Sequence, residues 1–165
     1  MLFELKTVFQ NEGETKSLRY ELDMSAIDTD GFFPFTEPVI VSAEAHNRTG
    51  IVTLELACKF TYDRVCDRCG EDASGIMEPV FEHKLVQSLA DEGNDDYIET
   101  PDFVIELDDI VISDILLTLP RKNLCKEDCR GLCPSCGKNL NLGDCGCDRR
   151  TVDPRLEILK QLMDE

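Results

Sequence analysis

Nine cysteines constrain the folding of this 165-residue chain more than any other feature. Eight of them are spaced as a pair in mid-chain and a closely spaced group of six near the end. In chain order these eight are Cys66, Cys69, Cys125, Cys129, Cys133, Cys136, Cys145 and Cys147. The start of the sequence lacks the basic and apolar regions of a secretion signal, so we expect reduced thiols that bind metal rather than disulfides.

Two cysteines separated by two residues can grip a metal ion from one tight turn, and four sulfur ligands complete a tetrahedral zinc site. The cysteines nearest in sequence form one expected group: Cys133, Cys136, Cys145 and Cys147. The other group is then Cys66, Cys69, Cys125 and Cys129. One ion bound by these four would link two segments about sixty residues apart and so close a long loop. We predict one or two structural zinc ions. An exchange of Cys129 and Cys133 between the groups and iron–sulfur ligation stay open as alternatives.

Alternating apolar residues predict strands over residues 2–9, 17–23, 39–46, 52–65, 76–89 and 103–107. Residues 47–50 have the composition of a hairpin turn, and Cys66 and Cys69 are expected at the tip of a second hairpin. Cys58 shares the apolar face of its strand and is expected in the core. Its partners on that face are Val52, Leu54, Leu56 and Phe60.

Two helices are expected later in the chain. Asp108 or Asp109 would cap a helix through Ile110 and Leu116 that stops at Pro120, and Asp153-Pro154 would start a C-terminal helix. The predicted fold class is therefore α+β: a mainly antiparallel β-domain with a helix, a cysteine-rich zinc-binding segment and a C-terminal helix. We expect an acidic domain over 1–120 and a zinc-binding segment over 121–165 that packs on it.

The charge of the chain is unevenly distributed. Residues 1–120 hold 8 Lys or Arg and 26 Asp or Glu, whereas residues 121–165 hold 9 and 8. The acidic part should repel phosphate backbones and attract basic partners, although acidity also simply aids solubility. No stretch is apolar enough to span a membrane, so a cytoplasmic location without membrane contact is expected.

Several segments together resemble the YceD family, also called the large ribosomal RNA subunit accumulation proteins. These are Cys66-Asp-Arg-Cys69-Gly, Asp114 to Pro120, the run from Cys125 through Cys136-Gly, Asn139-Leu-Asn141 and Asp153 to Lys160. The cysteine-rich tail is similar to the Gram-positive branch. The resemblance implies a role in large-subunit rRNA accumulation or processing, without an established catalytic mechanism. It also implies that Cys66, Cys69 and the first cysteines after Pro120, Cys125 and Cys129, are the shared metal-binding positions. The further set of Cys133, Cys136, Cys145 and Cys147 is expected to be a branch-specific stabilising site.

We therefore expect a non-enzymatic assembly factor that binds large-subunit rRNA or a pre-ribosomal particle. Arg121, Lys122, Arg149 and Arg150 are candidate RNA contacts, with ordinary surface charge as the alternative. A zinc adaptor for a basic ribosomal protein, without RNA contact, is a second hypothesis, and such an adaptor can also be dimeric.

A metal-dependent RNA-processing enzyme is the third hypothesis. Its candidate carboxylates are Asp95, Asp96, Asp108 and Asp109, which are more typical of a solvated loop and a helix start. His46 and His83 are both expected to be structural.

Overall fold

The computed structural model describes residues 1–29, 31–88 and 96–147. The described chain forms two compact units. The first comprises Met1–Arg64 and Ala73–Arg121, and the second comprises Val65–Asp72 together with the described residues 122–147. The tip of a hairpin thus belongs to the same unit as the cysteine-rich segment.

The first unit is built on a six-stranded sheet of order β2-β3-β4-β6-β7, with β5 paired to β4. Its strands are β2 (Thr15–Leu22), β3 (Val39–Arg48), β4 (Ile51–Tyr62), β5 (Gly75–Met77), β6 (Val80–Val86) and β7 (Tyr97–Glu99). All pairings are antiparallel except β6 with β7. A separate antiparallel pair joins β1 (Leu2–Glu4) to β8 (Val104–Glu106). The prediction of a mainly antiparallel α+β fold is confirmed.

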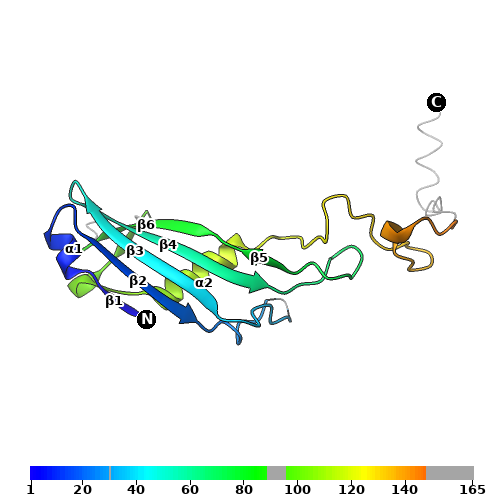
Figure 1. Cartoon of the computed structure of the whole chain (residues 1–165), viewed down its shortest axis with the longest axis horizontal. Coiled ribbons are helices and arrows are strands. Elements are labelled where there is room, and N and C mark those ends of the chain that lie inside the picture. Colours follow the sequence, from blue (N-terminus) through cyan, green and yellow to red (C-terminus); the bar gives the residue numbers. More distant parts are fainter. Residues whose placement is uncertain (30, 89–95, 148–165) are drawn as a thin grey trace, which may run out of the picture. The chain divides into compact units, whose positions relative to one another are not determined.

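The core lies on one face of this sheet. The side chains of Val41, Leu54 and Leu56 on β3 and β4 are fully buried there with Val111 and Ile115 of helix α2 (Leu107–Thr118). Figure 1 shows α2 running behind the strands on this side. Cys58 is 3% exposed in the same cluster, so its predicted place in the core is confirmed.

The β3–β4 hairpin is tighter than predicted. The strands run to Arg48 and from Ile51, so the loop is only Thr49-Gly50, whose φ angles are 57° and 82°. Two successive positive φ angles match the twist of flanking strands, and glycine adopts them at no steric cost. Asn47, expected in the turn, is instead buried and donates a hydrogen bond to the Val8 carbonyl over 2.8 Å.

Two long strand predictions are wrong in detail. Residues 2–9 divide into β1 and a short helix α1 (Lys6–Gln10), because Leu5 and Val8 are buried at helical rather than alternating spacing. Residues 76–89 divide into β5 and β6 around Pro79, which has no N–H to give to a ladder. Its carbonyl still accepts a hydrogen bond from the Cys58 N–H over 3.0 Å.

The start of α2 also differs from the prediction. Glu106 is its N-cap residue and makes no side-chain capping hydrogen bond, while Asp108 and Asp109 lie in the first helical turn. Asp108 instead forms an ion pair with the N-terminal amine over 2.7 Å. The expected C-terminal helix from Asp153-Pro154 lies outside the described residues.

Candidate metal centres

The Cys66–Cys69 pair lies in the turn between β4 and β5, as predicted. The turn is closed by hydrogen bonds from the Cys66 N–H to the Glu71 carbonyl over 2.7 Å and from the Gly70 N–H to the Cys66 carbonyl over 2.9 Å. Gly70 has a φ of 72°, a left-handed conformation that glycine adopts readily. The two sulfurs are thereby held on one side of a tight loop.

The Cys133–Cys136 pair repeats this geometry. The Cys133 N–H donates to the Lys138 carbonyl over 2.9 Å, the Gly137 N–H donates to the Cys133 carbonyl over 2.8 Å, and Gly137 also has a φ of 72°. The chain therefore contains two copies of one backbone turn, each with the sequence Cys-x-x-Cys-Gly. This shared turn is the local structure expected of a zinc knuckle.

The structure brings the eight spaced cysteines together in two groups of four. The first group is Cys66, Cys69, Cys125 and Cys129, and the second is Cys133, Cys136, Cys145 and Cys147. Within each group the sulfurs all lie within 4.8 Å of one another. All nine cysteines lie in the described chain and none forms a disulfide. The grouping is the one expected from sequence spacing.

The sulfur separations in the first group suit a single tetrahedral ion. The Sγ atoms of Cys66 and Cys129 are 3.7 Å apart, and those of Cys69 and Cys125 are 3.6 Å apart. Four Zn–S bonds of about 2.3 Å at tetrahedral angles place neighbouring sulfurs about 3.8 Å apart. The group can hold one metal ion, but it leaves no room for a multi-iron cluster.

The four thiols of the first group cannot all ionise easily by themselves. Burial disfavours the Cys66 thiolate, but backbone N–H donors, including those of Cys125 and Arg68, outweigh it and lower the pKa of Cys66 to about 6. Burial and the neighbouring sulfurs of Cys69 and Cys129 raise the pKa of Cys125 to about 12. A cation among the sulfurs, as a bound metal supplies, would favour the deprotonated form of these thiols.

A side chain from the second cysteine loop supports the first group. The Asn141 amide donates a hydrogen bond to the Cys129 sulfur over 3.3 Å, and this contact is the main cause that lowers the pKa of Cys129. Asn141 is itself fixed, because its Oδ1 accepts from the Arg130 N–H over 2.9 Å and its N–H donates to Asn139 Oδ1 over 3.0 Å. The sequence predicts no role for Asn141 beyond its place in the Asn139-Leu-Asn141 segment that resembles the family.

The loop between Cys66 and Cys69 is hydrogen-bonded to the chain around Cys129 and Leu132. The Leu132 N–H donates to the Arg68 carbonyl over 3.1 Å, and the Arg68 guanidinium donates to the Cys129 carbonyl over 2.8 Å. Gly131 lies so close that an added Cβ would be 3.1 Å from the Arg68 carbonyl oxygen. The loop that carries the first pair is thus held against the chain that leads into the second group.

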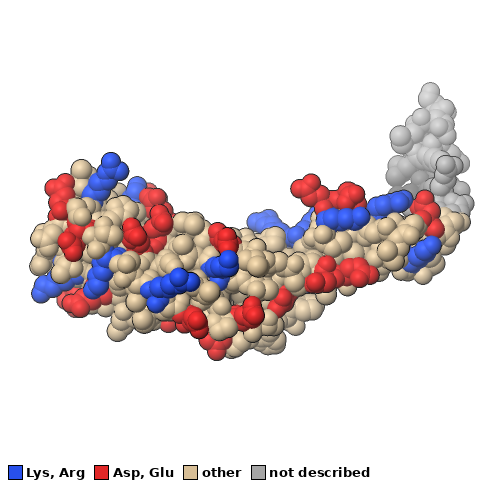
Figure 2. All heavy atoms as spheres, in the orientation of Figure 1, with Lys and Arg blue, Asp and Glu red and all other residues tan. Residues whose placement is uncertain are grey.

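The candidate RNA contacts are only partly described. Arg121 and Lys122 are exposed, and they fall on either side of the division between the two units; Arg149 and Arg150 lie outside the described residues. Two other basic side chains of the cysteine unit have acidic partners: Arg130 pairs with Asp144 over 3.1 Å and Lys126 with Asp128 over 3.8 Å. On the face shown in Figure 2, Lys and Arg are interspersed with Asp and Glu. On this face, the described part of the cysteine unit carries Asp and Glu among its Lys and Arg rather than a continuous basic patch.

The candidate carboxylates of a nuclease do not form a metal site in the described chain, where the two cysteine groups are the only clusters with ligand geometry. Asp95 lies outside the described residues, and Asp108 is engaged by the N-terminal amine. His83 has a structural partner, Asp114 on α2, at 2.7 Å.

Known protein families provide a second line of evidence beside the geometry of the cysteines. The family model described as "Large ribosomal RNA subunit accumulation protein YceD" matches residues 54–163, more than half of the chain and all eight clustered cysteines. The chain belongs to the YceD family. The predicted family membership is confirmed.

The curated relatives are modestly similar. A chloroplastic protein of Arabidopsis thaliana, named a large ribosomal RNA subunit accumulation protein YCED homolog, is 26% identical over 73% of this chain and 47% of its own length. The homolog of that name in Zea mays is 28% identical over 76% and 54%. An uncharacterized protein of Mycobacterium tuberculosis is 29% identical over 59% and 49%. The chain spans about half the length of these relatives.

No solved structure matches this YceD-family chain. Within the residues that the structure describes, no helix has the length and apolar character needed to cross a membrane.

Proposed function

We propose that this protein is a non-enzymatic zinc-binding factor that acts in the cytoplasm on large-subunit rRNA accumulation or processing, as part of ribosome assembly. The observation that carries the proposal is the pair of four-sulfur sites within the region that matches the YceD family. Each site has four sulfur ligands and keeps no open coordination position for a substrate, which is typical of structural rather than catalytic zinc.

Zinc fits these sites better than the alternatives. Four thiol sulfurs select soft ions such as zinc or iron, and the close approach of the sulfurs favours one ion over a cluster. A structural ion would hold the 65–72 turn and the chain after residue 122 in one unit, because few apolar side chains are buried there. Metal analysis of the purified protein tests this step, with about two zinc ions per chain expected. A value below one zinc per chain, with rapidly reacting thiols, would contradict it.

The role in rRNA accumulation is tested by complementation. Cells that lack the protein should accumulate less large-subunit rRNA, and the wild-type gene should restore it. A Cys66→Ser/Cys69→Ser variant should fail to restore it if the zinc unit is required, whereas a Cys58→Ala variant, which leaves both groups intact, should succeed. Equal rescue by both variants would show that rRNA accumulation does not require Cys66 and Cys69.

The proposal also includes direct contact between the protein and large-subunit rRNA. The purified protein is titrated with large-subunit rRNA across a salt series, because phosphate contacts weaken binding as salt rises. A variant with Arg121, Lys122, Arg149 and Arg150 changed to Glu should lose most of the affinity. Undiminished binding would remove these four residues from the RNA contact and move the proposal to a protein partner on the pre-ribosomal particle.

A further inference from the structure

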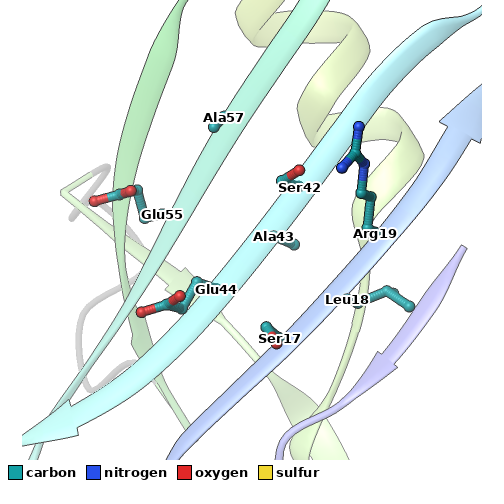
Figure 3. Close-up of a pocket in the computed structure, with 8 residues that line it drawn as sticks. All are labelled: Ser17, Leu18, Arg19, Ser42, Ala43, Glu44, Glu55 and Ala57. Carbon is teal, nitrogen blue, oxygen red and sulfur yellow. The ribbon is translucent and has the colours of Figure 1, made fainter.

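The face of the six-stranded sheet opposite the core carries a row of glutamates, in which Glu44 is opposite Glu55 and Glu55 is opposite Glu82. Two of them line a depression of about 320 Å³ together with Arg19, which projects from β2 (Figure 3). Lys84 of β6 lies on the same face as Glu82. Because cations and carboxylates are mixed there, the face favours neither an anionic nor a cationic ligand. The hydrogen bonds between the two cysteine groups point to a more specific property.

One loop of the cysteine unit contacts both metal-binding groups. It comprises residues 137–144, which connect the two cysteine pairs of the second group. The Asn141 amide of this loop donates to the Cys129 sulfur of the first group over 3.3 Å. The Asn139 amide donates to the Glu71 carboxylate over 3.3 Å, and Glu71 lies in the turn that holds the other cysteine pair of the first group. The loop of the second group therefore supports both halves of the first.

Little apolar burial holds this loop in place. Its two apolar side chains are Leu140, which is 5% exposed, and Leu142, which is 80% exposed. Burial of one leucine offsets the conformational entropy of only about one or two ordered residues, whereas the loop spans 137–144. A metal ion bound by Cys136 and Cys145 would close the loop at both ends and reduce the entropy that it loses on ordering. Order in the loop should therefore depend on metal at the second site.

The second site is also the more open of the two. Three of the four cysteines in the first group are buried, whereas in the second group one is buried, two are half-buried and one is exposed. The buried member of the second group is Cys133, and the exposed one is Cys136. A chelator or another metal-binding molecule reaches exposed sulfur more easily than buried sulfur. The second site should therefore exchange its ion with solution before the first site does.

We propose that the second site is a regulatory metal site, where the bound ion determines how tightly the first site holds its own ion. With the second site filled, the loop is ordered and Asn141 donates to Cys129. With the second site empty, this donor is lost and the first site weakens. By thermodynamic linkage, each ion raises the affinity for the other by the same factor. The inference rests on the proposed zinc binding and adds to it that free zinc is the effector of the first site.

The test measures the zinc affinity of the first site in the full chain, by competition with a chelator of known affinity under reducing conditions. Mass spectrometry of alkylated peptides shows which cysteines the metal protects and so identifies the site. The Cys145→Ser/Cys147→Ser variant removes the second site and keeps all four ligands of the first. Asn141→Ala is made in the wild type and in that variant. Leu142→Ala, an exposed position of the same loop, is the matched control in both backgrounds.

Loss of the second site should weaken zinc binding at the first site about tenfold or more, and Leu142→Ala should change it less than about twofold. Asn141→Ala should cost a similar tenfold in the wild type. It should cost less than about twofold when the second site is already absent, because the loop then no longer positions the amide.

Two results would overturn the coupling and leave the proposed function intact. One is a first-site affinity that stays within about twofold of the wild type when the second site is absent. The other is an Asn141→Ala effect of equal size in both backgrounds, because the amide would then act without the second ion. A wild-type chain that binds no zinc would instead overturn the proposed zinc binding, and the coupling with it.

Discussion

The Asn141 side-chain amide donates a hydrogen bond to the Cys129 sulfur over 3.3 Å, although Asn141 lies in the loop of the other cysteine group. A donor to a metal-binding sulfur stabilises its negative charge and fixes its orientation. The two candidate sites are therefore connected by hydrogen bonds and are not independent of each other.

Changing Asn141 to Ala should weaken metal retention at the first site by about 10- to 100-fold, because Cys129 loses its donor. The measurement is competition for zinc with a colorimetric chelator, followed as the rate and midpoint of release. Leu142→Ala is the matched control, since Leu142 is the next residue and is 80% exposed. Identical release from both variants would show that the hydrogen bond does not support the site.

Removal of the metal should unfold the cysteine unit and leave the sheet unit folded. The core of the first unit contains none of the eight clustered cysteines, whereas the second unit buries few apolar side chains besides its sulfurs. Hydrogen exchange after treatment with a chelator should show lost protection at residues 65–72 and 122–147 and retained protection at β3 and β4. Equal loss in both units would contradict this independence.

Gly131 should not tolerate a side chain. Its φ of 72° is left-handed, and an added Cβ would lie 3.1 Å from the Arg68 carbonyl oxygen. Gly137 has the same φ but nothing within 4 Å of an added Cβ, so it is a control for backbone strain alone. Gly131→Ala should cost about 1 kcal/mol more than Gly137→Ala, because it adds a steric clash to the shared strain. Zinc release and denaturant unfolding of the two variants provide the comparison, and equal destabilisation would count against the close approach.

Burial of Cys58 predicts a pH dependence of folding. Burial raises the pKa of Cys58 to about 11, above its ordinary value of 9.0, with a smaller contribution from Asp114. The stability that depends on the neutral thiol is therefore complete below pH 9 and lost as the pH rises through 11. The difference in free energy of unfolding between the wild type and Cys58→Ala should shrink by about 1–3 kcal/mol over this range. A difference that is constant with pH would contradict the raised pKa.

Local sequence patterns predicted the long strands of the sheet but not its shortest strand or the start of helix α2. Alternation identified β3 and the buried face of β4, because both strands bury every second residue. It missed β7, a three-residue strand paired in parallel with β6, since such a strand is too short to show alternation. It also placed the N-cap of α2 at Asp108 or Asp109, whereas the N-cap is Glu106. Asp108 pairs instead with the N-terminal amine, which is distant in sequence.

The sequence alone determined which eight cysteines are candidate metal ligands, because chelation needs short spacing within a pair and four sulfurs per ion. It also determined the acidity of the first 120 residues and the burial of Cys58. The tertiary structure decided that Cys129 lies in the first group and Cys133 in the second. Only the tertiary structure decided that Asn141 supports Cys129, that Gly131 faces Arg68, and that Glu44, Glu55 and Glu82 form one row. These relationships join residues on different loops or strands, and their distances depend on loop closure and strand register, which local spacing does not specify.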